Sequence, residues 1–77
     1  MLKLSSKWAR DLARQPETGM GYQITSVSLK NGNRFDGVVI VGGIITKIRG
    51  RKDVPFAENQ IDSIVVTHDR WDFSLEE

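Results

Sequence analysis

The sequence predicts a small α+β domain that is mainly β, with one short N-terminal helix and a strongly bent antiparallel sheet or barrel. Three observations support this SH3-like or Sm-like class. An amphipathic stretch at 5–15 stops at a proline, short β-branched runs recur between residues 22 and 73, and tight turn signals separate them. We expect four or five strands in a single domain over residues 1–77, with a frayed tail at 74–77.

The helix is predicted over residues 5–15, "SSKWARDLARQ". Ser5 or Ser6 caps its first amides, and Trp8 with Leu12 forms an i, i+4 apolar pair that needs an apolar surface to dock on. Pro16 ends the helix because it lacks an N–H group. The basic residues lie largely off the apolar stripe: Lys7, Arg10 and Arg14.

The first strand of the sheet is predicted over 22–30, after a connector at 16–21. Its apolar positions change parity, and a bulge near Thr25–Ser26 would reconcile them. Asn31-Gly32 is the strongest hairpin signal in the chain, since a type I′ turn needs positive φ at both central positions. Gly32 is therefore a predicted structural residue.

The second strand is predicted over 33–41 and the third over 44–49, joined by a turn at Gly42-Gly43. Gly37 lies inside the second strand, where a glycine permits a sharp bend or a close backbone approach. The second strand becomes apolar on both sides from Val38 onward, which predicts cover on both faces. In the second strand, strict alternation places Phe35, Val39 and Val41 on one side and Val38 and Ile40 on the other. In the third strand, it places Ile44, Thr46 and Ile48 on one side and Ile45, Lys47 and Arg49 on the other.

The rest of the chain gives weaker signals. Residues 50–53 form a polar turn, and residues 54–60 suit either a short irregular strand or one helical turn. A β-branched run predicts a strand at 61–68, and residues 71–73 add a last short strand.

Length and composition restrict the function classes. A chain of 77 residues buries only about 60% of its unfolded surface, so association with another copy or partner is a natural supplement. The chain has no cysteine, which excludes disulfides and thiolate metal sites. No signal-peptide core and no window of about 20 apolar residues is present, so we expect a cytoplasmic protein without a membrane segment.

The charge is divided along the chain. Ten basic and three acidic residues precede Asp53, whereas one basic and seven acidic residues lie from Asp53 onward. This division suits a basic binding face beside an acidic tail. It equally suits oppositely charged faces that meet within one barrel or between copies.

The stretch "VSLKNGNRFDG", residues 27–37, resembles the first half of the Sm1 motif of the Sm-like family, which includes Sm, LSm and Hfq proteins. "IRG" at 48–50 is similar to the start of an Sm2 motif; alternatively, "IDSIVV" at 61–66 is the second motif. The resemblance covers about residues 5–67 and implies the barrel, ring-shaped homo-oligomers and RNA binding. It transfers Gly37 and Arg49, whereas "VGGII" at 41–45 lacks the nucleotide-pocket residues of the family.

The segment "KIRGRK" carries the candidate binding residues, because four cations within six positions can form one phosphate-contacting patch. The alternative is a solvated turn whose charges protect a strand edge from aggregation. The nucleic-acid-binding candidates are Lys47, Arg49, Arg51 and Lys52, and the structural glycines are Gly32, Gly37, Gly42 and Gly43.

No pattern in the sequence predicts catalysis. His68 has acidic neighbours but no second histidine or cysteine, so it indicates a surface or interface histidine rather than a metal ligand. Gly42-Gly43 is a turn and not a phosphate loop, since no Lys-Ser/Thr pair follows it. Trp71 and Phe73 pack, stack on bases or anchor a partner.

The sequence thus predicts a non-catalytic binding module without a cofactor, whose ligand is RNA or DNA. The alternative is a structural or protein-interaction subunit that assembles into a homo-oligomer.

Overall fold

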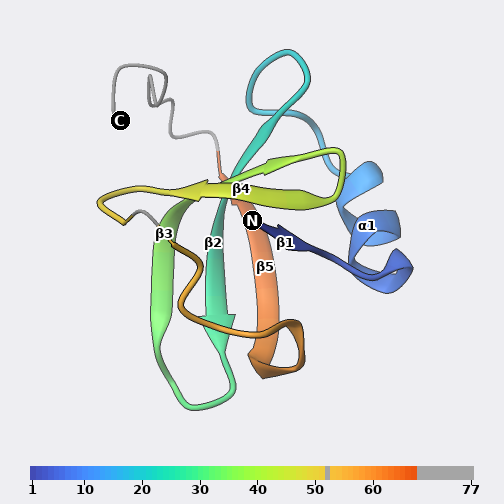
Figure 1. Cartoon of the computed structure of the whole chain (residues 1–77). Coiled ribbons are helices and arrows are strands. Elements are labelled where there is room, and N and C mark those ends of the chain that lie inside the picture. The colour runs from blue at the N-terminus through green and yellow to red at the C-terminus, as the bar shows by residue number, and fades with distance from the viewer. Residues whose placement is uncertain (52, 68–77) are drawn as a thin grey trace.

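A computed structural model of the chain describes residues 1–51 and 53–67. The predictions on Lys52 and on residues 68–77, including the strand at 71–73 and the frayed tail, lie outside this range. Figure 1 shows the elements in chain order, which are β1 (Leu2–Lys3), α1 (Ser6–Ala13), β2 (Gln23–Leu29), β3 (Arg34–Val41), β4 (Ile44–Ile48), the 3-10 helix η1 (Glu58–Gln60) and β5 (Ile61–Thr67).

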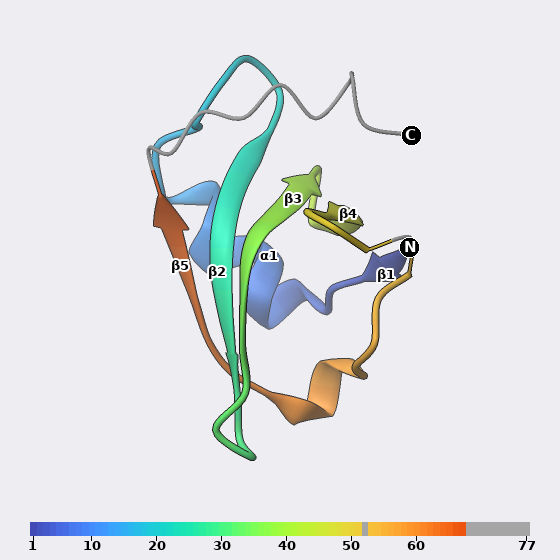
Figure 2. The same cartoon turned by 90° about the vertical axis from the view of Figure 1, so that its left-hand side faces the viewer.

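The five strands form one antiparallel sheet in the order β1-β4-β3-β2-β5, curled into a half-barrel (Figures 1 and 2). This confirms the predicted α+β, mainly β class. The meander β2-β3-β4 has the predicted connectivity, and β5 returns to pair with the other side of β2. β1 was not predicted; it is a two-residue strand that pairs Leu2 with Ile45 of β4. Residues 58–60 adopt the helical alternative for their segment.

Helix α1 is two residues shorter at its C-terminal end and one shorter at its N-terminal end than predicted. Ser5 is the N-cap residue, but its hydroxyl makes no capping bond, contrary to the prediction. Its backbone N–H instead donates to the carboxylate of Glu58, which ties the start of α1 to η1. Leu12 is buried and Trp8 packs against the same core, as the i, i+4 pair predicts.

The two hairpins differ in turn chemistry. Gly42 and Gly43 have φ of +56° and +77°, so this β3–β4 connection has the two positive φ values of a type I′ turn. In the β2–β3 hairpin only Gly32 has positive φ, at +93°, so the type I′ prediction for Asn31-Gly32 is wrong. There Leu29 N–H donates to Asn33 O at 2.8 Å and Gly32 N–H to Leu29 O at 3.0 Å, closing a three-residue loop.

Gly37 is where β3 bends. The β2–β3 register pairs Thr25 with Val38 but Val27 with Phe35, so β3 holds one extra residue between these pairs. The predicted bulge therefore exists at this level of the sheet, but the extra residue belongs to β3 and not to β2. Gly37 adopts φ +66°, a conformation that costs residues with a side chain about 1 to 2 kcal/mol.

The bulges correct the predicted strand faces. Phe35 packs against the same core as Val38 and Ile40, not on the side of Val39, because the extra residue in β3 reverses the alternation. A second register shift gives β4 an extra residue near Thr46, so that Ile45 and Ile48 both enter the main core instead of facing opposite ways.

The hydrophobic core has two parts. The main cluster fills the inner side of the half-barrel. Its residues come from α1, from β2 to β5 and from the segments that follow β1 and precede η1, and they are Leu4, Leu12, Val27, Leu29, Val38, Ile40, Ile45, Ile48, Phe56 and Ile61. A smaller cluster joins Ile24, Val39 and Tyr22 on the other face of the sheet. Val38, Val39 and Ile40 are all buried, which matches the predicted two-sided cover, although Val41 is 40% exposed.

Buried polar side chains join the connector and α1 to the sheet. The Gln23 amide donates to Leu12 O at 2.8 Å and to Gln15 O at 3.4 Å, so it satisfies carbonyls at the C-terminal end of α1. Thr18 Oγ1 accepts from Ile24 N–H at 3.0 Å and donates to Thr67 O at 2.7 Å. This hydroxyl replaces a direct backbone bond between β2 and β5.

In the described part of the chain, no helix has the length and apolar character needed to cross a membrane.

Substitution of Gly37 tests the bend. A Cβ atom at Gly37 would lie 2.7 Å from Arg49 Cβ, so Gly37→Ala adds a clash to the backbone strain. We expect Gly37→Ala to lower the free energy of unfolding by at least about 1 kcal/mol more than Gly32→Ala, measured by urea denaturation. Gly32→Ala is the matched control, because it also has positive φ but no atom within 4 Å of the added Cβ. Equal losses in the two variants would contradict the close approach at Gly37.

Candidate functional site

The basic segment that follows β4 is a tight turn. Arg51 N–H donates to Ile48 O at 3.0 Å, and Gly50 between the two arginines has φ +79°. Arg49 and Arg51 are both exposed. The turn therefore fixes the backbone of two cations at the end of β4.

Arg49 is held against the bulge in β3. Its N–H donates to Gly37 O at 3.0 Å, and its Cβ, Cγ and Cδ atoms lie where a side chain at Gly37 would stand. Only glycine leaves room for this approach. The bend and the position of Arg49 thus depend on the same residue.

Arg51 lies over an aromatic pair. Its guanidinium carbon is 5.5 Å from the ring centroid of Phe35, and the rings of Phe35 and Phe56 are 5.3 Å apart with an interplanar angle of 39°. Both distances are within the ranges of cation–π and aromatic pair contacts. Phe56 is buried and Phe35 is half-buried, so the core supports the ring on which Arg51 rests.

The other two predicted cations have different positions. Lys47 is half-buried and pairs with Val39 inside the β3–β4 ladder, before the turn. Lys52 lies outside the described residues. The structure thus brings Arg49 and Arg51 together on one turn, and we call these two residues with Phe35 the arginine turn.

Asp36 forms a polar cluster on the bulged part of β3 that the sequence analysis did not identify. Its Oδ1 accepts from Ser26 Oγ at 2.7 Å and from Arg34 Nε at 2.9 Å. The hydrogen bond from Ser26, followed by that from Arg34, lowers the pKa of the Asp36 carboxyl below its ordinary value of 3.8. The i, i+2 spacing of Arg34 and Asp36 on one strand was the available signal, whereas Ser26 is brought in by the β2–β3 pairing.

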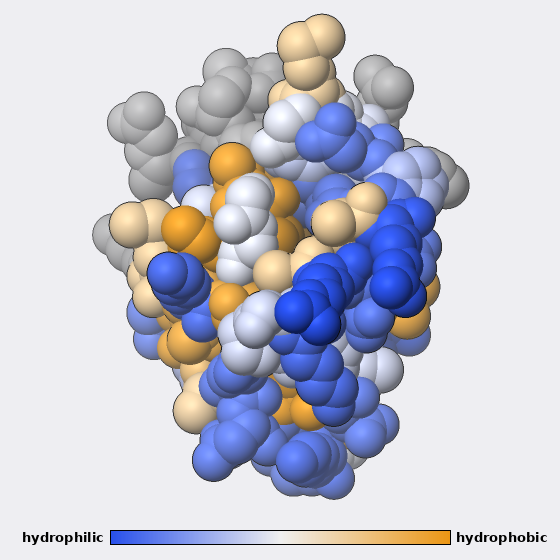
Figure 3. All heavy atoms as spheres, turned by 90° about the vertical axis from the view of Figure 1, so that its right-hand side faces the viewer, coloured by the Kyte–Doolittle hydropathy of each residue, from blue (hydrophilic) through white to orange (hydrophobic). Residues whose placement is uncertain are grey.

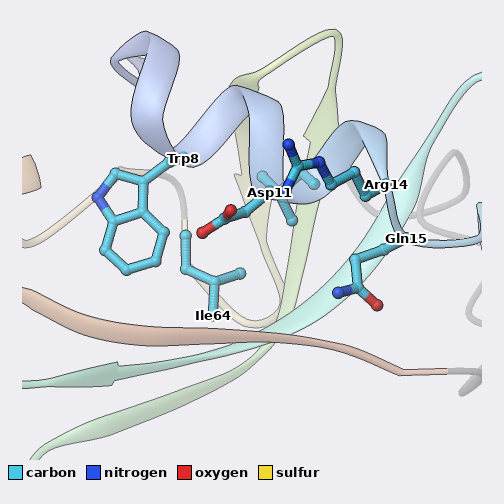
Figure 4. Close-up of a pocket in the computed structure, with 6 residues that line it drawn as sticks. Trp8, Asp11, Arg14, Gln15 and Ile64 are labelled. Atoms are coloured by element: carbon cyan, nitrogen blue, oxygen red, sulfur yellow. The ribbon is translucent and has the colours of Figure 1, made fainter.

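A pocket of about 270 Å³ lies between α1 and β5, and it was also not predicted. Figure 4 shows Ile64 extending from β5 toward α1, with Trp8 on one side and Arg14 and Gln15 on the other, and Asp11 above Ile64. Its lining, which defines what we call the α1–β5 pocket, consists of Trp8, Asp11, Leu12, Arg14, Gln15 and Ile64.

His68, considered above as a metal ligand and set aside, lies outside the described residues. Across residues 1–51 and 53–67, no three His, Cys, Asp or Glu side chains gather closely enough to hold a metal ion.

Comparisons of the chain with protein-family models, curated proteins and solved structures found no match. The resemblance to the Sm-like family therefore stays a hypothesis that rests on the residues quoted for it.

The Asp36 cluster predicts a dependence of stability on pH. Because the folded-state pKa is lowered, the stabilisation from Asp36 is fully present above pH 3.8 and is lost as the pH falls through the folded-state value. We expect Asp36→Asn to be less stable than the parent chain at neutral pH, and this difference to shrink when urea denaturation is repeated below pH 3.8. A difference that is unchanged by acid would mean that the Asp36 charge contributes nothing.

Proposed function

We propose that this protein is a non-catalytic nucleic-acid-binding module and that the arginine turn contacts the phosphate backbone of RNA or DNA. The observation that carries the proposal is the position of Arg49 and Arg51, two exposed cations fixed on one turn against β3. A guanidinium group held against a ring, as that of Arg51 is by Phe35, loses less side-chain entropy on binding phosphate than an unsupported cation.

The aromatic partner of Arg51 adds to this support. Guanidinium groups bind phosphate oxygens in a bidentate manner, and an aromatic ring beneath the guanidinium plane holds its orientation. Arg34 is a further exposed cation on the same strand as Phe35, although it is paired with Asp36 at 2.9 Å.

Salt-dependent binding tests the proposal. We expect a fluorescein-labelled single-stranded oligonucleotide to bind at low salt, with affinity that falls between about 50 mM and 200 mM salt through counterion release. Arg49→Ala and Arg51→Ala should each reduce the slope of log K against log[salt] by about 0.7, measured by fluorescence anisotropy. A labelled duplex with the same sequence shows whether the module distinguishes single strands.

Arg10→Ala is the matched control, because it removes one exposed cation from α1 and leaves the arginine turn intact. The absence of binding at low salt, or an equal effect of all three substitutions, would contradict the proposal.

The alternative function is a structural or protein-interaction subunit that assembles into a homo-oligomer through opposite charges. Among the described residues, the acids of the C-terminal third that could take part are Asp53, Glu58 and Asp62. Glu58 already accepts the Ser5 N–H. Light scattering on the same samples separates the two functions, since assembly predicts an oligomer without nucleic acid that dissociates as salt rises.

A further inference from the structure

Strand β5 ends the sheet. It pairs only with β2 among residues 1–51 and 53–67, so the edge that faces away from β2 has no strand beside it there. An open strand edge offers main-chain donors and acceptors to a second chain. β5 has seven residues, whereas β1 at the opposite end of the sheet has two.

The hydroxyl bonds at the top of the β2–β5 ladder establish which groups face that edge. Ile24 of β2 and Thr67 of β5 are opposite each other. Thr18 Oγ1 bridges Ile24 N–H and Thr67 O, and Thr67 Oγ1 donates to Ile24 O at 3.0 Å. The main-chain groups of Ile24 and Thr67 therefore point toward each other, between the two strands. Main-chain direction alternates along an antiparallel strand. Ile64 and Val66 therefore direct their N–H and C=O groups at the open edge.

The α1–β5 pocket lies on the inner side of the same edge, with Ile64 in its lining. A chain added beside β5 would place every second side chain on that inner side, and the residue next to Ile64 would enter the pocket against Trp8 and Leu12. The volume of about 270 Å³ is below the ~300–1,000 Å³ of small-molecule sites and suits one large side chain.

The charges beside the pocket favour an acidic ligand. α1 and its C-cap carry the exposed cations Lys7, Arg10 and Arg14 against one acid, Asp11; of these four residues, Arg14 and Asp11 line the pocket. Figure 3 views this side of the molecule and shows strongly hydrophilic side chains gathered over α1. On the outer side of β5, Val65 is 58% exposed and offers an apolar contact.

We infer that the open edge of β5 and the α1–β5 pocket together bind an extended acidic peptide of a partner protein as an added strand. One large apolar side chain of the peptide fills the pocket. An acidic residue two positions from it faces Arg14, and the residues between contact Val65. This inference does not rest on the proposed nucleic-acid function, because the arginine turn lies after β4 and beside β3, away from β5.

The probe is a fluorescein-labelled heptapeptide, Thr-Glu-Val-Trp-Val-Glu-Thr, with the tryptophan as anchor and a glutamate two positions to either side of it. The comparison peptides carry alanine for the tryptophan or lysine for both glutamates. We expect the probe to bind the full chain in fluorescence anisotropy and each comparison peptide to bind at least about tenfold more weakly.

Variants of the protein separate the charge from the strand pairing. Arg14→Glu should weaken binding of the probe by about tenfold. Lys30→Glu, the same reversal of charge on an exposed residue of the β2–β3 loop, should change it by less than about twofold. Val66→Pro should abolish binding, because it removes an N–H directed at the open edge and leaves the inward-facing groups of Val65 and Thr67 in place.

Amide hydrogen exchange gives a readout that does not depend on Val66→Pro being folded. We expect the N–H groups of Ile64 and Val66 to exchange rapidly in the chain alone and to become protected when the probe is bound. Failure of the probe to bind, or binding without this protection, would overturn the inference. Protection of these N–H groups in the absence of peptide would also overturn it. If that protection rises with protein concentration, a second copy of the chain occupies the edge. If it is the same at every concentration, the chain covers its own edge.

Discussion

The close approach between Gly37 and Arg49 is the constraint on which the rest of the structure depends. Gly37 has a positive φ and no side chain, and this lets β3 bulge and bend. It also lets the segment after β4 come close enough for Arg49 N–H to donate to Gly37 O at 3.0 Å. The bend curls the sheet enough for α1 and the inner faces of the strands to share one core. It also reverses the alternation of β3, which turns Phe35 inward beneath Arg51.

The chain therefore separates its charged features onto different parts of a small sheet. The arginine turn depends on β3, the bulge and the end of β4. The cations of α1 lie beside β5, at the other end of the strand order. A chain that buries little surface gains from this arrangement, because like charges spread over two regions repel each other less than one continuous basic patch.

Local signals in the sequence predicted the fold class well and the residue contacts less well. Gly32, Gly37 and Gly42-Gly43 were identified because glycine at turns and bends has a local cause. The faces of Phe35 and Ile45 were wrong, since one extra residue in a strand inverts the alternation and only the strand pairing reveals it. β1 was missed because two residues carry no periodic pattern. The segment "KIRGRK" indicated Arg49 and Arg51 only as part of a patch with Lys47 and Lys52. The Phe35 contact and the α1–β5 pocket join residues distant in sequence and have no local signal.

The most direct measurement of the central claim, that the arginine turn is the nucleic-acid contact, is a titration of the ¹⁵N-labelled chain with a single-stranded oligonucleotide at low salt, followed by amide chemical shifts. We expect the largest shifts on residues 34–37 and 48–51, where the bulge and the turn meet. Shifts confined to α1, or no shifts at any oligonucleotide concentration, would contradict it.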